Sequence, residues 1–94
     1  YIAAADAIGK RQSVIITLTD TDLQVSLMIS GSRREYRRWS YADAIGVGDI
    51  TGRSDYELSL VCDGVHFRPH GSRRMLQQLQ SALLEAILSY DWEE

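Results

Sequence analysis

Cysteine is almost absent from this chain of 94 residues, and long apolar runs are missing altogether. The single cysteine, Cys62, excludes a disulfide within the chain and fits a reducing compartment best. No apolar run approaches the roughly 18 residues that a membrane-spanning helix needs. Residues 1–8 have neither the basic start nor the apolar length of a signal peptide. We therefore interpret the chain as a cytoplasmic piece of a longer polypeptide, in which any membrane segments lie outside this chain.

An excess of basic residues is also missing. The formal net charge is −3, whereas general nucleic-acid binders usually carry a net positive charge, so we expect no nucleic-acid partner. Nine of the ten basic residues are arginines, and the distribution of these charges is more informative than their total. Six of them form two clusters, one of Arg33, Arg34, Arg37 and Arg38 and one of Arg73 and Arg74.

Short strands are predicted over most of residues 13–68. Residues 13–18 are rich in β-branched side chains, and the polar residues 20–22 end that strand. Period two in residues 23–29 places four aliphatic side chains on one face of a strand. They are Leu23, Val25, Leu27 and Ile29, and they alternate with Gln24, Ser26 and Met28. In the strand predicted over residues 34–41, we expect Trp39 and Tyr41 to face the core. These segments predict an antiparallel arrangement with one buried face.

Glycine and aspartate mark the turns that follow. Gly46 and Gly48 interrupt a strand-like segment at residues 45–50, which predicts a bulge. Residues 51–55 are predicted to be a loop. Asp63-Gly64 predicts a tight hairpin turn between strands at residues 56–62 and 65–68. Because Cys62 alternates with leucines in the first of these strands, we expect its side chain to be buried.

The chain closes with a helical pattern at residues 72–90. At 100° per residue, eight apolar side chains fall on one stripe, as a helix that packs on a core requires. Ser72 is in the position of an N-cap. The stripe consists of Met75, Leu76, Leu79, Ala82, Leu83, Ala86, Ile87 and Tyr90.

Strands followed by one helix define the fold class. We predict a mainly β domain with one C-terminal α-helix, in which a bent antiparallel sheet or partial barrel is capped by that helix. We assign residues 13–94 to this domain and leave residues 1–12 as an N-terminal segment of uncertain structure.

Two short motifs in this layout resemble a known family. The sequence ITLTDTDL (residues 16–23) has the Leu-Thr-Asp that often precedes the second strand of bacterial pleckstrin-homology-like (PH-like) domains. WSYADAIGV (residues 39–47) resembles a second motif of that family, although Ala44 separates Asp43 from Ile45, which the family has adjacent. The resemblance covers residues 13–90. It implies a bent barrel with a capping helix, used for binding or assembly, often next to membrane segments and without catalytic activity.

Motifs for chemistry are weak. His66 and His70 would share a strand face, but two ligands are half a metal site and Pro69 interrupts the strand. Residues 46–52 are glycine-rich without the lysine or following helix of a phosphate-binding loop. No nucleophile elbow accompanies any serine. We expect no catalytic residues, no metal and no cofactor.

The first arginine cluster has two interpretations. Arg33, Arg34, Arg37 and Arg38 flank a hairpin turn, and the planar guanidinium group suits phosphate or carboxylate. Charged side chains also protect exposed edge strands from pairing with other chains, and we favour this second interpretation.

The second cluster lies in the first turn of the predicted helix. There the macrodipole disfavours cations, so a bound anion near Gly71, Ser72, Arg73 and Arg74 would offset the repulsion. Alternatively, these arginines are solvated or pair with Asp49 or Asp55. An acidic lipid or phosphate is therefore the candidate ligand of both clusters.

Three apolar side chains lie off the core stripe of the helix. Leu84, Leu88 and Trp92 are predicted to face outward, which favours a contact with a protein partner or a homodimer. The alternative is that residues 2–8 fold back and cover them. Together these features favour a non-catalytic protein-interaction or assembly module, the soluble part of a membrane-associated bacterial protein. The other hypothesis is a module that binds anions or acidic lipid head groups through the arginines.

Overall fold

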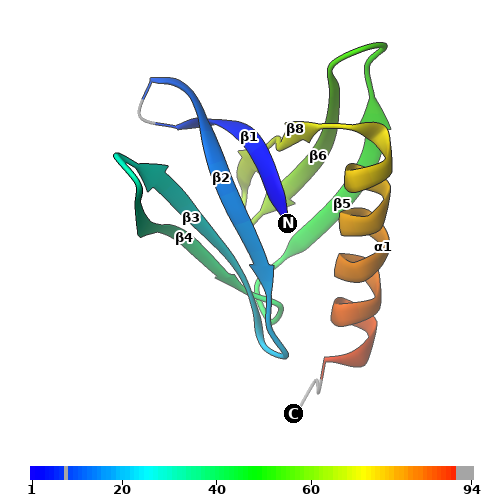
Figure 1. Ribbon diagram of the computed structural model, residues 1–94. Coiled ribbons are helices and arrows are strands. Elements are labelled where there is room, and N and C mark those ends of the chain that lie inside the picture. The colour runs from blue at the N-terminus through cyan, green and yellow to red at the C-terminus, as the bar shows by residue number, and fades with distance from the viewer. Residues whose placement is uncertain (8, 91–94) are drawn as a thin grey trace.

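Eight strands form one antiparallel sheet, and a single helix follows them in the residues that the structure describes (Figure 1). The computed structural model describes residues 1–7 and 9–90. This confirms the predicted fold class. In chain order the elements are β1 (Ile2–Ala7), β2 (Lys10–Leu18), β3 (Asp22–Ile29), β4 (Ser32–Ser40), β5 (Ile45–Thr51), β6 (Tyr56–Cys62), β7 (Val65–Phe67), β8 (His70–Gly71) and α1 (Arg73–Ser89).

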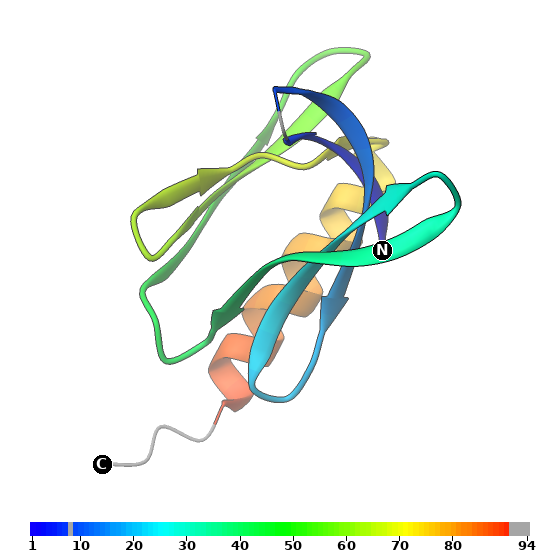
Figure 2. The same ribbon diagram turned by 90° about the vertical axis from the view of Figure 1, so that its left-hand side faces the viewer.

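The strand order is β4-β3-β2-β1-β8-β6-β5, with β7 also paired to β6. Strands β4 and β5 are the two ends of this order, so the sheet bends strongly but does not close (Figure 2). A single residue pair, Ala4 opposite His70, joins the β1–β4 half to the β5–β8 half. The sheet is therefore a partial barrel with a narrow backbone junction between its halves.

The N-terminal residues are part of the sheet. The sequence left residues 1–12 without an assigned structure, but Ile2–Ala7 form β1, and β2 begins at Lys10. The boundary placed at residue 13 therefore falls within β2. Strand β1 pairs with β2 along its whole length, and Ala3 and Ala5 are buried in the core. Small alanine side chains here gave no clear period-two signal from which the strand could have been predicted.

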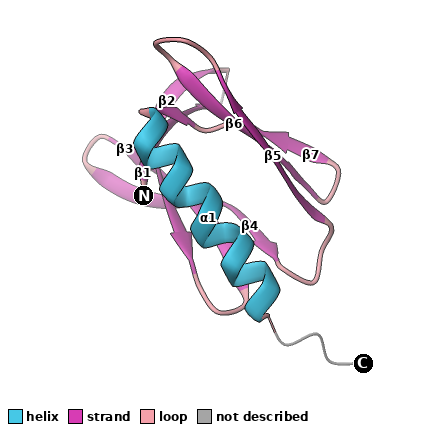
Figure 3. Cartoon of the chain, turned by 90° about the vertical axis from the view of Figure 1, so that its right-hand side faces the viewer, coloured by secondary structure: helices cyan, strands magenta, loops and turns pink. Residues whose placement is uncertain are grey.

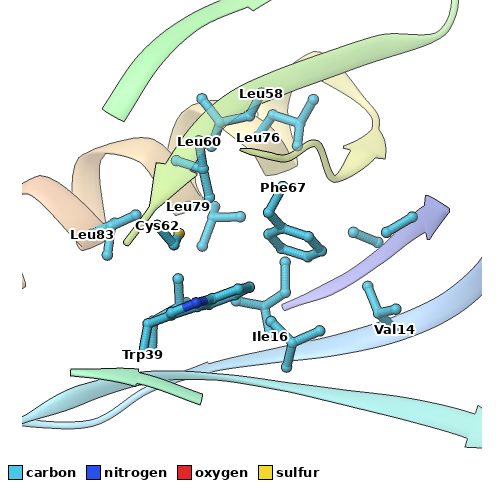
Figure 4. Packing of buried hydrophobic residues seen from close by; sticks show 14 of the residues in the cluster. Val14, Ile16, Trp39, Leu58, Leu60, Cys62, Phe67, Leu76, Leu79 and Leu83 are labelled. Atoms are coloured by element: carbon cyan, nitrogen blue, oxygen red, sulfur yellow. The ribbon is translucent and has the colours of Figure 1, made fainter. Parts of the chain in front are cut away.

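The hydrophobic core fills the concave side of the bent sheet (Figure 4). Trp39 and Tyr41 are both buried, as predicted, and Trp39 packs against Phe67 with 5.7 Å between ring centroids. Tyr41 donates a hydrogen bond from its hydroxyl to the carbonyl of Thr19 at 2.8 Å, which satisfies its buried polar atom. Cys62 is fully buried, as its position in the strand pattern predicted.

Helix α1 lies across the open side of the sheet (Figure 3) and buries Leu76, Leu79 and Leu83 completely. Ser72 is the N-cap, and its hydroxyl accepts a hydrogen bond from the amide of Met75 at 3.2 Å. The other members of the predicted stripe are partly buried. The predicted helix, its cap and its core face are thus confirmed.

The predicted hairpin turn and bulge also occur. Asp63 and Gly64 have φ angles of 50° and 79°, the left-handed pair that a two-residue turn between β6 and β7 requires. The register of β5 against β6 shifts between Val47 and Ile50, which places a bulge beside Gly48. The loop predicted at residues 51–55 is shorter than expected, because Thr51 still pairs with β6.

Candidate interaction surface

The outward face of α1 exposes two leucines. Leu84 is 44% exposed and Leu88 is 83% exposed, and they are one helical turn apart on the same face. We call this pair the outer flank. Residues 2–7 do not cover it, because they form β1, which pairs with β2 and β8, and both leucines are exposed; residue 8 of the predicted covering segment lies outside the described residues. The third predicted interface residue, Trp92, lies outside the described residues.

A groove of about 600 Å³ lies between the first half of α1 and the end of β5. We call it the α1–β5 groove. Gln80 bridges its two walls, since its Nε2 donates to the carbonyl of Gly48 at 2.8 Å. Leu84 follows Gln80 by one helical turn, so the outer flank continues the helical wall of the groove. The lining of the α1–β5 groove consists of Asp49, Ile50, Thr51, Gly52, Tyr56, Arg73, Gln77 and Gln80.

The groove combines opposite charges that do not neutralise each other. Within residues 1–7 and 9–90, neither Arg73 nor Asp49 forms an ion pair or a hydrogen bond through its side chain. The pairing of Arg73 or Arg74 with Asp49 or Asp55, considered from the sequence, is therefore not found; Asp55 instead accepts a hydrogen bond from Arg11. Arg73 and Arg74, the second arginine cluster, are exposed at the start of α1. There the Ser72 hydroxyl caps the Met75 amide.

The two ends of the sheet differ in charge. Strand β4 carries four arginines and one glutamate, whereas β5 carries a single charged residue, Asp49. Charge on an edge strand opposes pairing with another chain. The charges of β4 thus oppose its pairing with a strand of another chain. In β5, the features that oppose such pairing are the bulge and the contact of Gln80 with Gly48.

The four arginines of β4 are divided between two faces. Arg34 and Arg37 lie opposite Leu27 and Val25, and residues opposite each other in an antiparallel pair have side chains on the same face. These two arginines are therefore on the side of the sheet that faces the core, although both are exposed at its edge. The guanidinium of Arg37 lies over the ring of Tyr36, 5.2 Å from its centroid.

Arg33 and Arg38 occupy the other face and already have partners. Arg33 Nη2 donates to Thr17 Oγ1 at 3.1 Å. Arg38 Nη2 donates to Glu35 Oε1 at 2.6 Å, and its Nε lies 3.9 Å from Asp22 Oδ2. The arginines predicted as one anion site therefore form two pairs on opposite faces of the sheet. Arg33 and Arg38 are bonded to side chains of the sheet, whereas the side chains of Arg34 and Arg37 form no hydrogen bond or ion pair in the described residues.

Sequence reasoning missed a charged cluster at the junction of the two sheet halves. Arg11 Nη1 donates to Asp55 Oδ2 at 3.0 Å, and its Nε lies 3.5 Å from Asp6 Oδ1. The hydrogen bond that Arg11 donates to Asp55 raises the pKa of the Arg11 guanidinium. His70 places Nδ1 3.3 Å from Asp55 Oδ2 and Nε2 3.6 Å from Glu57 Oε2. This cluster supports the narrow junction, and no spacing signals it because its residues are far apart in the sequence.

A second groove, of about 470 Å³, lies between the end of β2 and the second half of α1. Asp20 and Glu85 contribute carboxylates to it, and Ala82 and Ala86 form its helical wall. The opposite wall carries larger apolar side chains, those of Tyr1, Ile16 and Leu18. We give this groove no further role.

The residues considered for chemistry are dispersed. Burial raises the pKa of the Cys62 thiol from 9.0 to about 11, which keeps it protonated at neutral pH. His66 is exposed, whereas His70 belongs to the cluster around Arg11. In the described part of the chain, no group of three or more histidine, cysteine, aspartate or glutamate side chains could hold a metal ion. The one helix of that part is too short and too polar to span a lipid bilayer.

Comparison with protein-family models, curated proteins and solved structures finds no match to this chain.

Proposed function

We propose that this chain is a non-catalytic protein-interaction module with a PH-like fold, and that it binds through the outer flank of α1. Its partner is a second copy of the chain or another protein. We propose further, from the resemblance and the single cysteine, that the chain is the cytoplasmic, soluble part of a membrane-associated bacterial protein. The fold proposal is supported by four consecutive strands, β1–β4, followed by a second group of strands and one C-terminal helix.

The exposure of Leu84 and Leu88 carries the proposal. An isolated exposed leucine is common, but two on adjacent turns of one helix make a continuous apolar surface. The core does not need them, because Leu76, Leu79 and Leu83 already fill the helix's buried face. Burial of the outer flank in a protein contact would stabilise the complex by about 25 cal/mol for each Å² of apolar surface removed from water.

Sedimentation velocity at tens of micromolar protein tests the homodimer form of this proposal. We expect the wild type to associate with rising concentration and the Leu84→Ser, Leu88→Ser double variant to remain monomeric. The control variant, Gln78→Ser with Ser81→Ala, changes exposed positions on the same helix and should behave as the wild type. Association that is equal in all three proteins would contradict a role for the outer flank.

A second candidate function is binding of acidic lipid head groups by the arginines. The observation that favours it is that the β1–β2 and β3–β4 turns lie at the same end of the meander (Figure 1), which brings Lys10, at the start of β2, toward the end that carries Arg33 and Arg34. Such basic groups attract acidic lipid with an affinity that falls with salt.

Vesicle sedimentation distinguishes the two candidates. We would use vesicles of phosphatidylcholine with and without phosphatidylserine, at low and moderate salt. Lipid binding predicts a loss in the Arg33→Gln, Arg34→Gln variant and no loss in the Arg53→Gln, Arg68→Gln control, which removes the same charge from exposed positions elsewhere. Equal losses would indicate a general charge effect, and no binding by the wild type would remove this candidate.

A further inference from the structure

Strand β5 has one free edge with outward-directed backbone groups. Asp63 donates its amide to the carbonyl of Ala44 at 2.8 Å, so the chain is bonded toward β6 at residue 44. Hydrogen bonding alternates along an antiparallel pair. Before the bulge, the N–H and C=O groups of Ile45 and Val47 therefore point away from β6. These groups match what an added strand needs.

Helix α1 forms the wall beside that edge and runs in the opposite direction. Arg73 and Gln77 line the groove with Thr51 and Gly52, whereas Gln80 reaches Gly48 further back along β5. Because the helix and the strand run in opposite directions, Leu84 and Leu88, which follow Gln80 in α1, lie toward the beginning of β5. The surface along β5 therefore carries polar side chains and two charges of opposite sign, Arg73 and Asp49, at one end, and apolar side chains at the other.

The side chains of β5 leave apolar surface at the same place. Ile45 and Val47 lie opposite Cys62 and Leu60 and so face the core. Both remain partly exposed, because β5 is the last strand at its end of the sheet. Gly46, between them, is exposed and has no side chain to obstruct an approaching backbone. An extended segment placed here would cover apolar surface and satisfy backbone groups together.

We propose that an extended peptide segment of a partner protein adds as an antiparallel strand to β5, beside α1. In this orientation, its N-terminal part lies at Arg73 and carries an acidic side chain, and its C-terminal part lies at the outer flank and carries an apolar side chain. The charge of Arg73, which has no ion pair in the described residues, selects the acidic end. The inference rests on the proposed function and names its partner class.

Selection of random peptides a dozen residues long, displayed on phage and captured on the purified chain, provides the probe. We expect enriched peptides to have an acidic residue preceding alternating apolar residues. Synthetic copies should bind the Leu88→Asp and Arg73→Glu variants about tenfold or more weakly than the wild type. The Gln78→Ser, Ser81→Ala control should retain wild-type affinity, and thermal melting should show that every variant is folded.

Hydrogen exchange tests strand addition itself. Binding of a selected peptide should slow exchange at the amides of Ile45 and Val47 by about tenfold or more, while amides of β4 keep their rates. Unchanged exchange at both amides overturns strand addition but leaves the outer flank intact if Leu88→Asp still weakens binding. A selection without enrichment, or peptides that bind every variant equally, overturns the inference, and sedimentation of the Leu84→Ser, Leu88→Ser variant then decides the proposed function separately.

Discussion

Gln80 of α1 is hydrogen-bonded to the backbone of Gly48 in β5, with 2.8 Å between Nε2 and the carbonyl oxygen. The bulge beside Gly48 leaves this carbonyl available to the helix. A Cβ at Gly48 would lie 3.0 Å from the carbonyl oxygen of Ser59, so glycine allows β5 to approach β6 closely there. The two residues together fix the distance between the helix and the free edge strand.

Replacing Gln80 with alanine should lower the free energy of unfolding by about 1 kcal/mol, because the hydrogen bond to Gly48 is lost. Urea denaturation followed by circular dichroism measures this change. Gln78→Ala is the matched control, since Gln78 is exposed on the same helix. Equal stability of the two variants would show that the hydrogen bond between Gln80 and Gly48 stabilises the fold no more than hydrogen bonds of the same groups with water.

Removal of the helix should abolish the compact fold. A chain ending at Gly71 lacks Leu76, Leu79 and Leu83, which are all fully buried. Each buried leucine contributes about 1.5–3 kcal/mol, so three of them are comparable with the whole stability of a small domain, about 5–15 kcal/mol. The truncated chain should be insoluble or give broad, poorly dispersed NMR signals. Sharp, dispersed signals would mean that the sheet is stable without its helix.

The sequence predicted the fold well where local pattern and burial agree. Period two in residues 23–29 identified the strand whose Leu23, Val25 and Leu27 are buried, and the helical stripe identified the buried leucines of α1. It failed for β1, because an alanine-rich strand has little contrast between its faces and is defined by its pairing with β2.

The candidate site was only partly predictable. The outward position of Leu84 and Leu88 follows from helical periodicity alone and is observed. The division of the arginines between two faces depends on a register shift of β4 opposite Val25 and Ser26, which no local signal marks. The groove beside β5 depends on the strand order of the whole sheet, which brings together residues distant in the sequence.

Gly52 should be the glycine least tolerant of alanine. Its φ is +121°, and a Cβ there would collide with the backbone carbonyl of Asp55. Gly64 has a φ of +79° with open space around it, so Gly64→Ala should cost about 1–2 kcal/mol of conformational strain alone. Gly52→Ala should cost about 1–3 kcal/mol more, because of the collision. Thermal melting of both variants tests the order; the reverse order would be inconsistent with this loop geometry.

Cys62 should make the protein sensitive to alkaline pH. Its pKa is raised by burial from 9.0 to about 11, so the folded state retains a proton that the unfolded state loses. The stability due to this thiol is fully present below pH 9.0 and is lost as the pH rises toward about 11, by roughly 2–3 kcal/mol in total.

The Cys62→Val variant keeps the apolar contact and removes the titrating group, so its stability should fall less over the same range. Some decline should remain, because burial, and then the charges of Asp22 and Asp20, also raise the pKa of Tyr41. Urea denaturation at pH values between 8 and 11 measures both slopes. If wild type and variant lost stability in parallel, the thiol of Cys62 would titrate in the folded state as freely as in the unfolded chain, and its burial in the core would have no effect on its ionisation.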